Sequence, residues 1–316
     1  FCWRTMESGE HIDLSQSRRF DDWHSPVTVS MSINRDRTMV THGHPAPVSS
    51  AELIGIPPPS SAVMIDLAET HEGELPSWVR DSARQGSLVF ADVGWDATER
   101  WDPAVMDRLQ VAHAFFPNAV EAMAYTRTRT PQEALYAIAD LVPLAVVTNG
   151  EDGALAIDSS TGEEVSVPAL RVDALDPTGA GDVFGAALTL GTLARWPLAD
   201  RLAFASLCSA LAIQQFGGSL AAPGWGDIAD WWRAARSRGA GDDDSQGGDT
   251  RRETTWHRPG EPMTSMPAAS LGARASGAPL SLTIKMRFAT RTPSALKAMP
   301  RPAASSDTRR RTWGIS

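Results

Sequence analysis

Lysine is almost absent from this sequence of 316 residues. Its only two lysines, Lys285 and Lys297, lie near the carboxyl-terminal end. A phosphate-binding P-loop needs a Lys after its glycines, and a protein kinase needs one on a strand beside its nucleotide. Neither site can be built within residues 1–239. Any phosphate bound by this part of the chain must be held by backbone amides, the amino end of a helix, Arg or a metal ion.

Cysteine and long apolar runs are also scarce. Cys2 and Cys208 are too few for a disulfide framework or a multi-cysteine metal site, which favours a reducing, cytoplasmic setting. The apolar run around Cys208 is far too short to span a membrane, and the start shows no pattern of a secretory signal. Because the chain begins with Phe1 rather than Met, we expect a fragment or a misassigned start.

Charge is unevenly distributed along the chain. Residues 1–239 contain 17 Arg and 31 acidic residues, a net charge of −14, whereas residues 240–316 carry a net charge of +5. An acidic body argues against general nucleic-acid binding. The basic end lacks interleaved aromatic residues, and its polar, Gly-rich composition predicts a disordered tail over 239–316 with one strand-like stretch at 280–288. The abrupt change in composition also fits a shifted reading frame.

Short apolar runs alternate with helical patterns over about residues 60–240, which predicts an α/β fold with a doubly wound, mostly parallel sheet flanked by helices. Residues 27–33 and 38–42 flank a turn with alternating apolar and polar side chains, so we expect a small β lid there. Residues 1–24 show no clean periodicity and are interpreted as an irregular segment. The predicted strands lie at 62–68, 87–93, 112–117 and 144–150, followed by a hairpin of 153–158 and 163–169 around the turn SSTG (159–162). The predicted helices lie near 74–85, 103–110, 118–126, 131–141, 181–195, 199–215 and 225–238.

The stretch DALDPTGAGDVFGAALTLG (173–191) places a Gly-Ala-Gly turn directly before an apolar helix. Glycines at 179 and 181 allow the backbone to approach a ligand closely. The amides of Gly179, Ala180, Gly181 and Asp182 would then lie at a helix start, where unpaired N–H groups and the helix dipole attract an anion. A phosphoryl group that develops charge during transfer is a suitable guest.

Three oxygen-bearing side chains accompany this turn. The carboxylate of Asp182 could accept the proton of an attacking alcohol. Asp176 and Thr178 could orient the loop or bind a hard monovalent cation. The same residues could instead simply cap a helix around a turn. A dinucleotide site is a weaker alternative, because the glycines follow G-x-G-x-x-x-G rather than G-x-G-x-x-G.

DPTGAGD resembles the carboxyl-terminal signature of the ribokinase-like (PfkB-type) carbohydrate kinases, D-T-x-G-A-G-D. Further segments resemble elements of that family in the same order. They are TVSMSINRDRTMVTH for the lid, FFPNAVEA for the N-x-x-E element, VVTNGEDGAL for the nucleotide-contacting element, and ALAIQQFGGS for the late helix and loop beside the adenine. The resemblance covers roughly residues 25–236 and implies a kinase domain over 25–238.

The resemblance implies an ATP-dependent kinase that transfers the γ-phosphoryl group to a sugar hydroxyl. Asp182 would be the base, and Gly179, Ala180 and Gly181 would form the anion hole. The resemblance further implies ATP, Mg²⁺ and in some members K⁺ as ligands, with a homodimer formed through the lid strands. Residues implied for the nucleotide are Asn118, Thr148, Gly150, Gly153, Gly181 and Gly218, and those implied for metals are Glu121 (through water), Asp176 and Thr178.

The amino-terminal third departs from the family pattern. No Gly-Gly element or first strand with sugar-contacting acids precedes residue 25, so we expect the chain to start inside the family fold. A catalytically impaired nucleotide-binding remnant, or a regulatory protein on the same fold, therefore stays an alternative. A nicotinamide oxidoreductase is disfavoured by the glycine spacing.

One further constellation suggests a metal. His42 and His44 flank a glycine in the sequence HGH. Two histidines without a third ligand are too few for a zinc site, so a polar hairpin end is the favoured interpretation.

Overall fold

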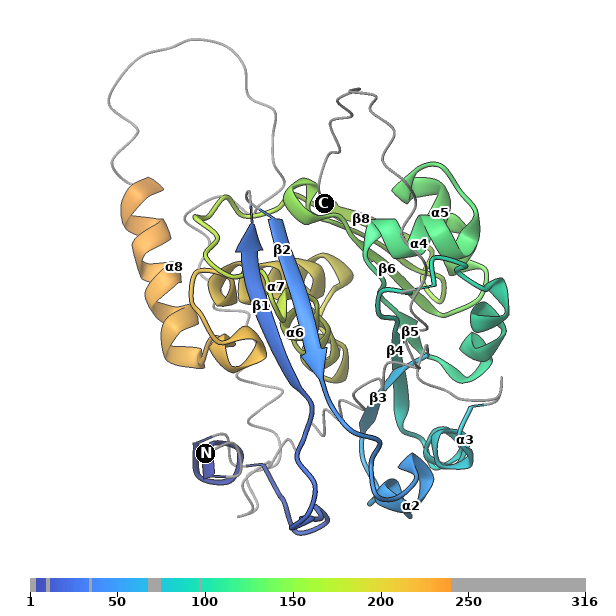
Figure 1. Cartoon of the computed structure of the whole chain (residues 1–316). Coiled ribbons are helices and arrows are strands. Elements are labelled where there is room, and N and C mark those ends of the chain that lie inside the picture. Colours follow the sequence, from blue (N-terminus) through green and yellow to red (C-terminus); the bar gives the residue numbers. More distant parts are fainter. Residues whose placement is uncertain (1–3, 10–11, 34–35, 68–74, 97, 240–316) are drawn as a thin grey trace, which may run out of the picture.

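A six-stranded sheet forms the centre of the molecule, and a separate two-stranded sheet accompanies it (Figure 1). The computed structural model describes residues 4–9, 12–33, 36–67, 75–96 and 98–239. The tail expected at 239–316 and its strand-like stretch therefore lie outside the described residues, apart from Gly239. Within the described ranges, no helix has the length and apolar character needed to cross a membrane.

The six strands follow one another in chain order across the large sheet. They are β3 (Ala62–Asp66), β4 (Leu88–Asp92), β5 (Ala114–Phe115), β6 (Leu144–Thr148), β7 (Ala154–Asp158) and β8 (Glu163–Val167). Strands β3 to β6 pair in parallel, whereas β7 and β8 add an antiparallel edge. The mostly parallel sheet is confirmed. Strand β5 is shorter than the predicted 112–117, and Pro117 has no amide with which to extend it.

Helices cover both faces of this sheet, with α4 and α5 on one side and α6 and α7 on the other (Figure 1). The α-helices are α2 (Ser50–Ile54), α3 (Ser77–Arg84), α4 (Ala119–Thr126), α5 (Pro131–Ala139), α6 (Ala180–Leu193), α7 (Leu198–Ala212) and α8 (Trp225–Gly239). Other helix types also occur. The 3₁₀-helices are η3 (Pro103–Val111), η4 (Gly150–Asp152) and η5 (Gly218–Ala221), and the π-helix is η1 (Thr5–Gly9). The helix predicted at 103–110 is thus present but has 3₁₀ geometry.

Successive strand residues alternate between two buried clusters, one on each face of the sheet. Val89, Ala91 and Phe115 pack with Leu135 and Ile138 on the side of α5. On the other side, Phe90, Ala114, Phe116 and Val146 pack with Leu188 and Leu202 of α6 and α7. Side chains that are apolar on both faces explain why these strands read as continuous apolar runs.

Helix α6 approaches the sheet closely because residue 185 is a glycine. A Cβ atom there would lie 2.6 Å from Cε2 of Phe116. The third glycine of G-x-G-x-x-x-G therefore serves helix–sheet packing. Neighbouring α7 buries Cys208, and burial raises the pKa of its thiol to about 12, so that the side chain stays a protonated apolar residue.

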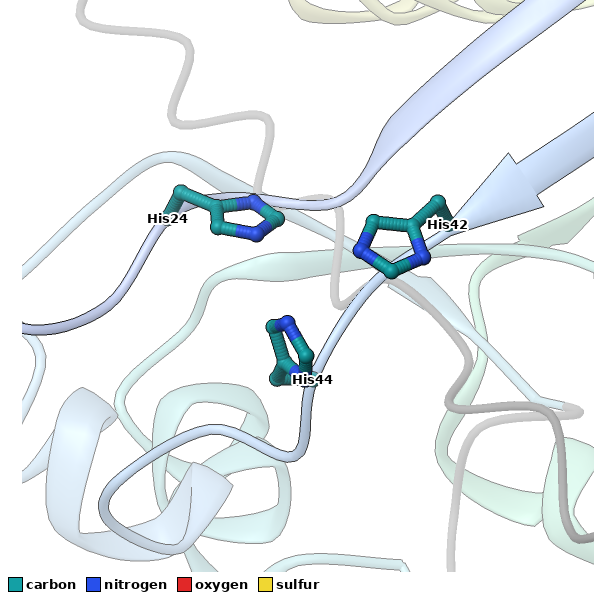
Figure 2. Close-up of side chains that lie close together, drawn as sticks. All are labelled: His24, His42 and His44. Carbon is teal, nitrogen blue, oxygen red and sulfur yellow. The ribbon is translucent and has the colours of Figure 1, made fainter.

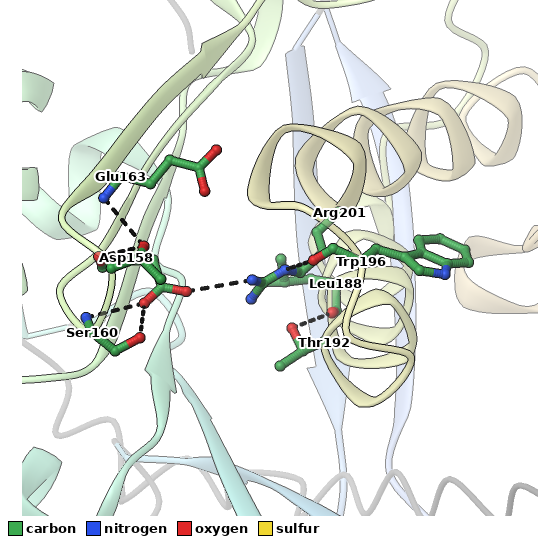
Figure 3. A network of polar contacts seen from close by, with 8 residues as sticks. Asp158, Ser160, Glu163, Leu188, Thr192, Trp196 and Arg201 are labelled. Atoms are coloured by element: carbon green, nitrogen blue, oxygen red, sulfur yellow. Dashed lines mark hydrogen bonds and ion pairs between the residues drawn. The ribbon is translucent and has the colours of Figure 1, made fainter. Parts of the chain in front are cut away.

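A nearly buried ion pair joins β7 to α7 (Figure 3). The Arg201 guanidinium lies 3.4 Å from Oδ2 of Asp158 and also donates from Nε to the carbonyl oxygen of Trp196, at 2.8 Å. The other carboxylate oxygen of Asp158 accepts hydrogen bonds from the amide and the hydroxyl of Ser160. This network fixes the antiparallel edge of the sheet to the helix that follows α6.

The small sheet is the hairpin of β1 (Val27–Ile33) and β2 (Asp36–His42). Its antiparallel register places Val27 opposite His42 and Val29 opposite Val40. Across the hairpin, the hydroxyls of Thr28 and Thr41 are 2.9 Å apart. The predicted strand pair is confirmed, with its second strand starting two residues earlier than expected.

Candidate active site

Polar side chains gather at the carboxyl ends of the parallel strands. Asp66 ends β3 and is in register with Asp92, which ends β4. Asn118 follows β5 and forms an isolated parallel bridge with Thr148 at the end of β6. Because carboxyl ends of parallel strands meet at one edge, ligands of open α/β sheets bind there. The structure thus brings together two elements that the sequence predicted as separate nucleotide contacts.

Asn118 and Glu121 form a capping box at the start of α4. Oδ1 of Asn118 accepts from the amide of Glu121 at 3.0 Å, and Oε2 of Glu121 accepts from the amide of Asn118 at 3.1 Å. This reciprocal pair satisfies two orphan donors of the helix. It also holds the Glu121 side chain in place, with only 7% of the residue exposed.

Burial and nearby carboxylates raise the pKa of Glu121 and of Asp92. Burial raises the pKa of Glu121 to about 7, against the opposing effect of its hydrogen bonds with Asn118, and the charge of Asp66 adds to the rise. Burial also raises the pKa of Asp92 well above its usual range, assisted by the charges of Glu121, Asp66 and Asp182. The charges of Glu121, Asp66 and Asp182, which lie in three other segments of the chain, therefore all act on the pKa of Asp92.

Asp66 and Asp92 were missed by the sequence interpretation. The signal that could have found them is their position, since each is an acid at the end of an apolar run, in AVMIDLA and SLVFADV. An acid has no packing reason to end a buried strand. Two such acids in adjacent strands point to the functional edge of the sheet.

Changing Glu121 to Gln should remove a pH-dependent cost to stability. A carboxyl group whose pKa is raised in the folded state binds its proton more tightly there, so it lowers the free energy of unfolding as pH rises from about 4.5 to 7. A rise of the pKa from 4.5 to about 7 corresponds to roughly 3 kcal/mol once the group is ionised. Urea denaturation at pH 4.5 and pH 8 should therefore show that the variant gains stability relative to the unchanged chain at the higher pH.

Glu133→Gln is the matched control for this experiment. Glu133 occupies the same third position of α5 and accepts from the amide of Arg129, but it is exposed. Solvent screens an exposed carboxylate, so this change should have a smaller effect at either pH. Equal pH responses of the two variants would contradict the assigned role of burial at Glu121.

The predicted anion-binding turn starts α6 in the structure. Gly179 is the N-cap with φ of 78°, a left-handed conformation that favours glycine. The amide of Ala180 donates to the carbonyl oxygen of Pro177 at 3.2 Å, so this predicted donor is engaged by the protein itself. Within the described part of the chain, the amides of Gly179, Gly181 and Asp182 have no protein acceptor.

Hydrogen bonds to Ile213, the residue that follows α7, hold the loop before α6. The carbonyl oxygen of Ile213 accepts from the amides of Leu175 and Asp176, at 2.8 and 3.1 Å. Oδ1 of Asp176 accepts from the amide of Thr178 at 3.0 Å, which makes a turn of the predicted cation-binding residues. Three hydrogen bonds therefore hold this loop, two of them to the end of α7.

The loop containing Gly218 packs directly against Gly179. A Cβ atom on Gly179 would lie 2.4 Å from the amide nitrogen of Ser219 and 2.8 Å from the carbonyl carbon of Gly218. Two segments that the sequence assigned to phosphate and adenine are therefore adjacent, although 39 positions separate Gly179 from Gly218 along the chain.

Gly179→Ala should destabilise the protein, because Ala fits neither the backbone conformation nor the space. The left-handed conformation alone should lower the free energy of unfolding by about 1–2 kcal/mol. Gly181→Ala is the matched control, since its Cβ would meet no atom within 4 Å and position 181 is helical. Gly181→Ala should raise the free energy of unfolding by up to about 1 kcal/mol, because Ala has a higher helix propensity than Gly. Urea denaturation measures both variants, and changes of the same sign in their free energies of unfolding would contradict this account.

Asp182 lies in the first turn of α6, half-buried beside the unpaired amides. Burial raises the pKa of its carboxyl group. A carboxylate in such surroundings is a stronger base than one in water. The start of α6 therefore combines amides that can bind an anion with a carboxylate that can accept a proton from a hydroxyl group.

The turn after β6 has a structural role as well. Gly150 starts η4 with φ of 52° and is exposed. Gly153 is buried, and a Cβ atom there would lie 2.0 Å from the carbonyl oxygen of Val167 on β8. The glycine at 153 is therefore required for the close approach of two backbones.

Residues 77–224 match the sequence profile of the pfkB family carbohydrate kinases. An aminoimidazole riboside kinase from Salmonella typhimurium is 38% identical over 149 residues, which are 44% of this chain and 46% of that protein. The chain spans less than half the length of the curated relatives it matches.

Solved structures share the fold. Aminoimidazole riboside kinase from Salmonella enterica, complexed with aminoimidazole riboside and an ATP analog, has 26% identity and a TM-score of 0.57, with 72% of this chain and 80% of that chain covered. Fructokinase from Vibrio cholerae, with fructose, ADP and calcium bound, has 23% identity and a TM-score of 0.57, with 72% and 79% covered.

Proposed function

We propose that this chain, whose residues 77–224 match the pfkB family of carbohydrate kinases, transfers the γ-phosphoryl group of ATP to a hydroxyl group of a small sugar. The observation that carries the proposal is the start of α6, where unpaired amides and the Asp182 carboxylate lie together at the ligand-binding edge of the sheet. No lysine is available in residues 1–239 to replace them.

Main-chain amides are the proposed anion hole. The amides of Gly179, Gly181 and Asp182, at the positive end of the helix dipole, would donate to a transferring phosphoryl group. Ala180 belongs to the same turn, but its amide must leave the carbonyl oxygen of Pro177 before it can contribute. Donors that are fixed before the reaction lower the cost of stabilising charge in the transition state.

Asp182 is the proposed base. Its carboxylate would accept the proton of the sugar hydroxyl as the oxygen attacks the γ-phosphorus, and the bond from that phosphorus to the bridging oxygen of ADP would break. The upward shift of its pKa by burial favours this proton transfer near neutral pH. The amides on the same helix turn would hold the phosphoryl group beside it.

Mg²⁺ fits the acids at the ends of β3 and β4. Mg²⁺ prefers oxygen ligands and commonly keeps several waters when it binds one or two carboxylates and a phosphate. The charges that act on Asp92 come from carboxylates alone, namely Glu121, Asp66 and Asp182, which suits a hard cation. We assign Glu121 to the metal through water. When bound, Mg²⁺ would neutralise the phosphates of ATP.

The remaining ligand contacts follow the arrangement of the loops. Thr148, Gly150 and Gly153 after β6, with Asn118 beside them, would line the phosphates and ribose of ATP. Gly218 would contact the adenine from the loop packed on Gly179. Asp176 and Thr178, held in one turn, would bind an activating K⁺ through their oxygens.

The hairpin of β1 and β2 is the proposed dimer contact. Val27, Val29, Met31 and Val40 are exposed on it, each by 42% or more. Such an apolar face is more stable when covered, and the same face of a second copy is the proposed cover. Analytical ultracentrifugation of the full chain tests this contact, since a monomer at every concentration would contradict it.

Two measurements separate the kinase from the alternative of an impaired nucleotide-binding remnant. Calorimetry should show binding of ATP with Mg²⁺, and coupled detection of ADP should show release that depends on a sugar. The panel should include ribose, fructose and aminoimidazole riboside. Binding without sugar-dependent release would favour the remnant. No binding of ATP would contradict both.

A further inference from the structure

Three histidines meet at the open end of the β1–β2 hairpin (Figure 2). His24 precedes β1, His42 ends β2, and His44 follows two residues later. One ring nitrogen from each lies within 4.8 Å of the other two, and all three residues are exposed. The sequence HGH lacked a third ligand; the fold supplies His24 from 18 positions upstream.

Strand pairing and backbone packing bring these side chains together. The register opposes Val27 to His42 and so continues the two legs of the hairpin side by side. The legs touch where Gly43 faces Pro26, since a Cβ atom on Gly43 would lie 2.9 Å from Cγ of Pro26. The indole nitrogen of Trp23 donates to the carbonyl oxygen of His44 at 3.3 Å. Strand pairing, the packing of Gly43 on Pro26 and the hydrogen bond from Trp23 thus hold the three histidines close together.

The rings are arranged around a common centre. The centroids of His24 and His44 are 5.1 Å apart, as are those of His42 and His44, and both pairs are nearly perpendicular. His24 and His42 are stacked with centroids 5.7 Å apart. Perpendicular rings allow nitrogens from different directions to face one point, which a stack of three rings would not.

A second contact sets the tautomer of His24. Its Nδ1 lies 2.9 Å from the carbonyl oxygen of Ser25. A carbonyl oxygen only accepts, so Nδ1 carries the hydrogen and a neutral His24 presents the lone pair of Nε2. A hydrogen bond from the non-ligating nitrogen to a backbone carbonyl is the usual support of a metal-binding histidine.

We propose that His24, His42 and His44 bind a divalent transition metal, for which Zn²⁺ is the reference ion. Imidazole suits Zn²⁺, Cu²⁺ and Ni²⁺, whereas Mg²⁺ and Ca²⁺ prefer oxygen. Tetrahedral Zn²⁺ with bonds of 2.0–2.1 Å needs nitrogens about 3.3–3.4 Å apart. The rings must therefore close by no more than about 1.5 Å, which side-chain rotation at an exposed site supplies. Water fills the fourth position.

The bound metal would link the two legs of the hairpin. His24 belongs to the leg that enters β1, and His42 and His44 belong to the leg that leaves β2. A metal bound only by the folded arrangement stabilises that arrangement. The site is separate in residues and in ligand chemistry from the acids at the ends of β3 and β4, so it can be tested whether or not the chain phosphorylates a sugar.

The test is a metal titration of the full chain, prepared without a histidine tag and freed of metal by chelation. Competition against a chromogenic chelator should give one Zn²⁺ per chain. Co²⁺ should give the visible absorption of a tetrahedral site. Changing any one of the three histidines to Ala should weaken Zn²⁺ binding at least about tenfold, because each supplies a ligand. Millimolar Mg²⁺ should not compete.

The other four histidines provide the control. A variant with Gln at His11, His71, His113 and His257 should keep one tight Zn²⁺ site. Circular dichroism in chelator should show each Ala variant folded as the unchanged chain is, because the altered side chains are exposed. The proposal is overturned if Zn²⁺ does not bind, if one Zn²⁺ binds per two chains, or if affinity survives loss of His42 and His44 together.

Discussion

Asp182→Asn should lower the turnover of sugar phosphorylation by about 10³-fold, within the range that positioned acid–base groups contribute. Asn is nearly the same size as Asp and can occupy the same place in the first turn of α6, but it cannot accept the proton of the attacking hydroxyl. The amides that hold the phosphoryl group are unchanged, so the dissociation constant of ATP with Mg²⁺ should stay within about threefold. The measurements are sugar-dependent ADP release and calorimetry.

Asp173→Asn is the control for this variant. It removes a carboxylate from the same segment, nine positions earlier, where the side chain is exposed and outside the proposed site. Its turnover should match that of the unchanged chain. Retained turnover in Asp182→Asn would remove Asp182 as the base, whereas equal losses in both variants would point to a general effect of charge.

Arg201→Met should lower the free energy of unfolding by about 3 kcal/mol, because it leaves the Asp158 carboxylate nearly buried without its counter-charge. The side chains of Arg201 and Asp158 are only 14% and 11% exposed. Ser160 keeps its two hydrogen bonds to the carboxylate, which puts the expected loss at the lower end of the usual range for breaking a buried pair. Urea denaturation at pH 7 measures it.

An exposed pair of the same residue types provides the control. Arg84 pairs with Asp81 at 2.7 Å, but both side chains are more than half exposed. Arg84→Met should therefore change the free energy of unfolding by less than about 1 kcal/mol. Adding Asp158→Asn to Arg201→Met should recover part of the loss, since a neutral Asn needs no counter-charge. A double variant less stable than Arg201→Met would contradict this account of the pair.

The cost of losing Arg201 should also depend on pH. Burial opposes ionisation of Asp158, but the hydrogen bonds from Ser160 and the charge of Arg201 together lower its pKa below the ordinary value. A lowered pKa in the folded state stabilises the protein above the unfolded value of about 3.9, and this stabilisation is lost as pH falls through the folded value. The difference between the unchanged chain and Arg201→Met should therefore shrink below about pH 4.

Local patterns in the sequence predicted most of the secondary structure. The Asn at 118 and the acid at 121 predicted a helix start, and the structure contains the complete capping box. The alternating residues of 27–33 predicted a half-buried strand; β1 confirms the strand, but Val27, Val29 and Met31 on its apolar face are exposed. Apolar runs predicted the parallel strands because both of their faces are buried. These elements can be predicted from the sequence because each depends on hydrogen bonds or packing within one short segment.

Contacts between segments that lie far apart in the sequence could not be predicted in the same way. Asp66 and Asp92 lie in separate strands, and only the parallel register brings them to Glu121 and Asp182. His24 joins His42 and His44 only through the register of the hairpin. In the turn before α6, the glycines predicted available amides, but the engagement of the Ala180 amide by Pro177 follows from the backbone conformation of the folded loop.

The sequence by itself determined the chemistry that is possible: without lysine in residues 1–239, a phosphate site must use amides, Arg or metal, and GAGD before an apolar helix supplies such amides beside a carboxylate. Only the tertiary structure decided which groups act together and with what acidity. The physical reason is the separation along the chain between the groups that interact. Helix caps and strand patterns arise between neighbours in the chain, whereas burial and the effect of the Glu121 and Asp182 charges on Asp92 arise between segments that become neighbours only on folding.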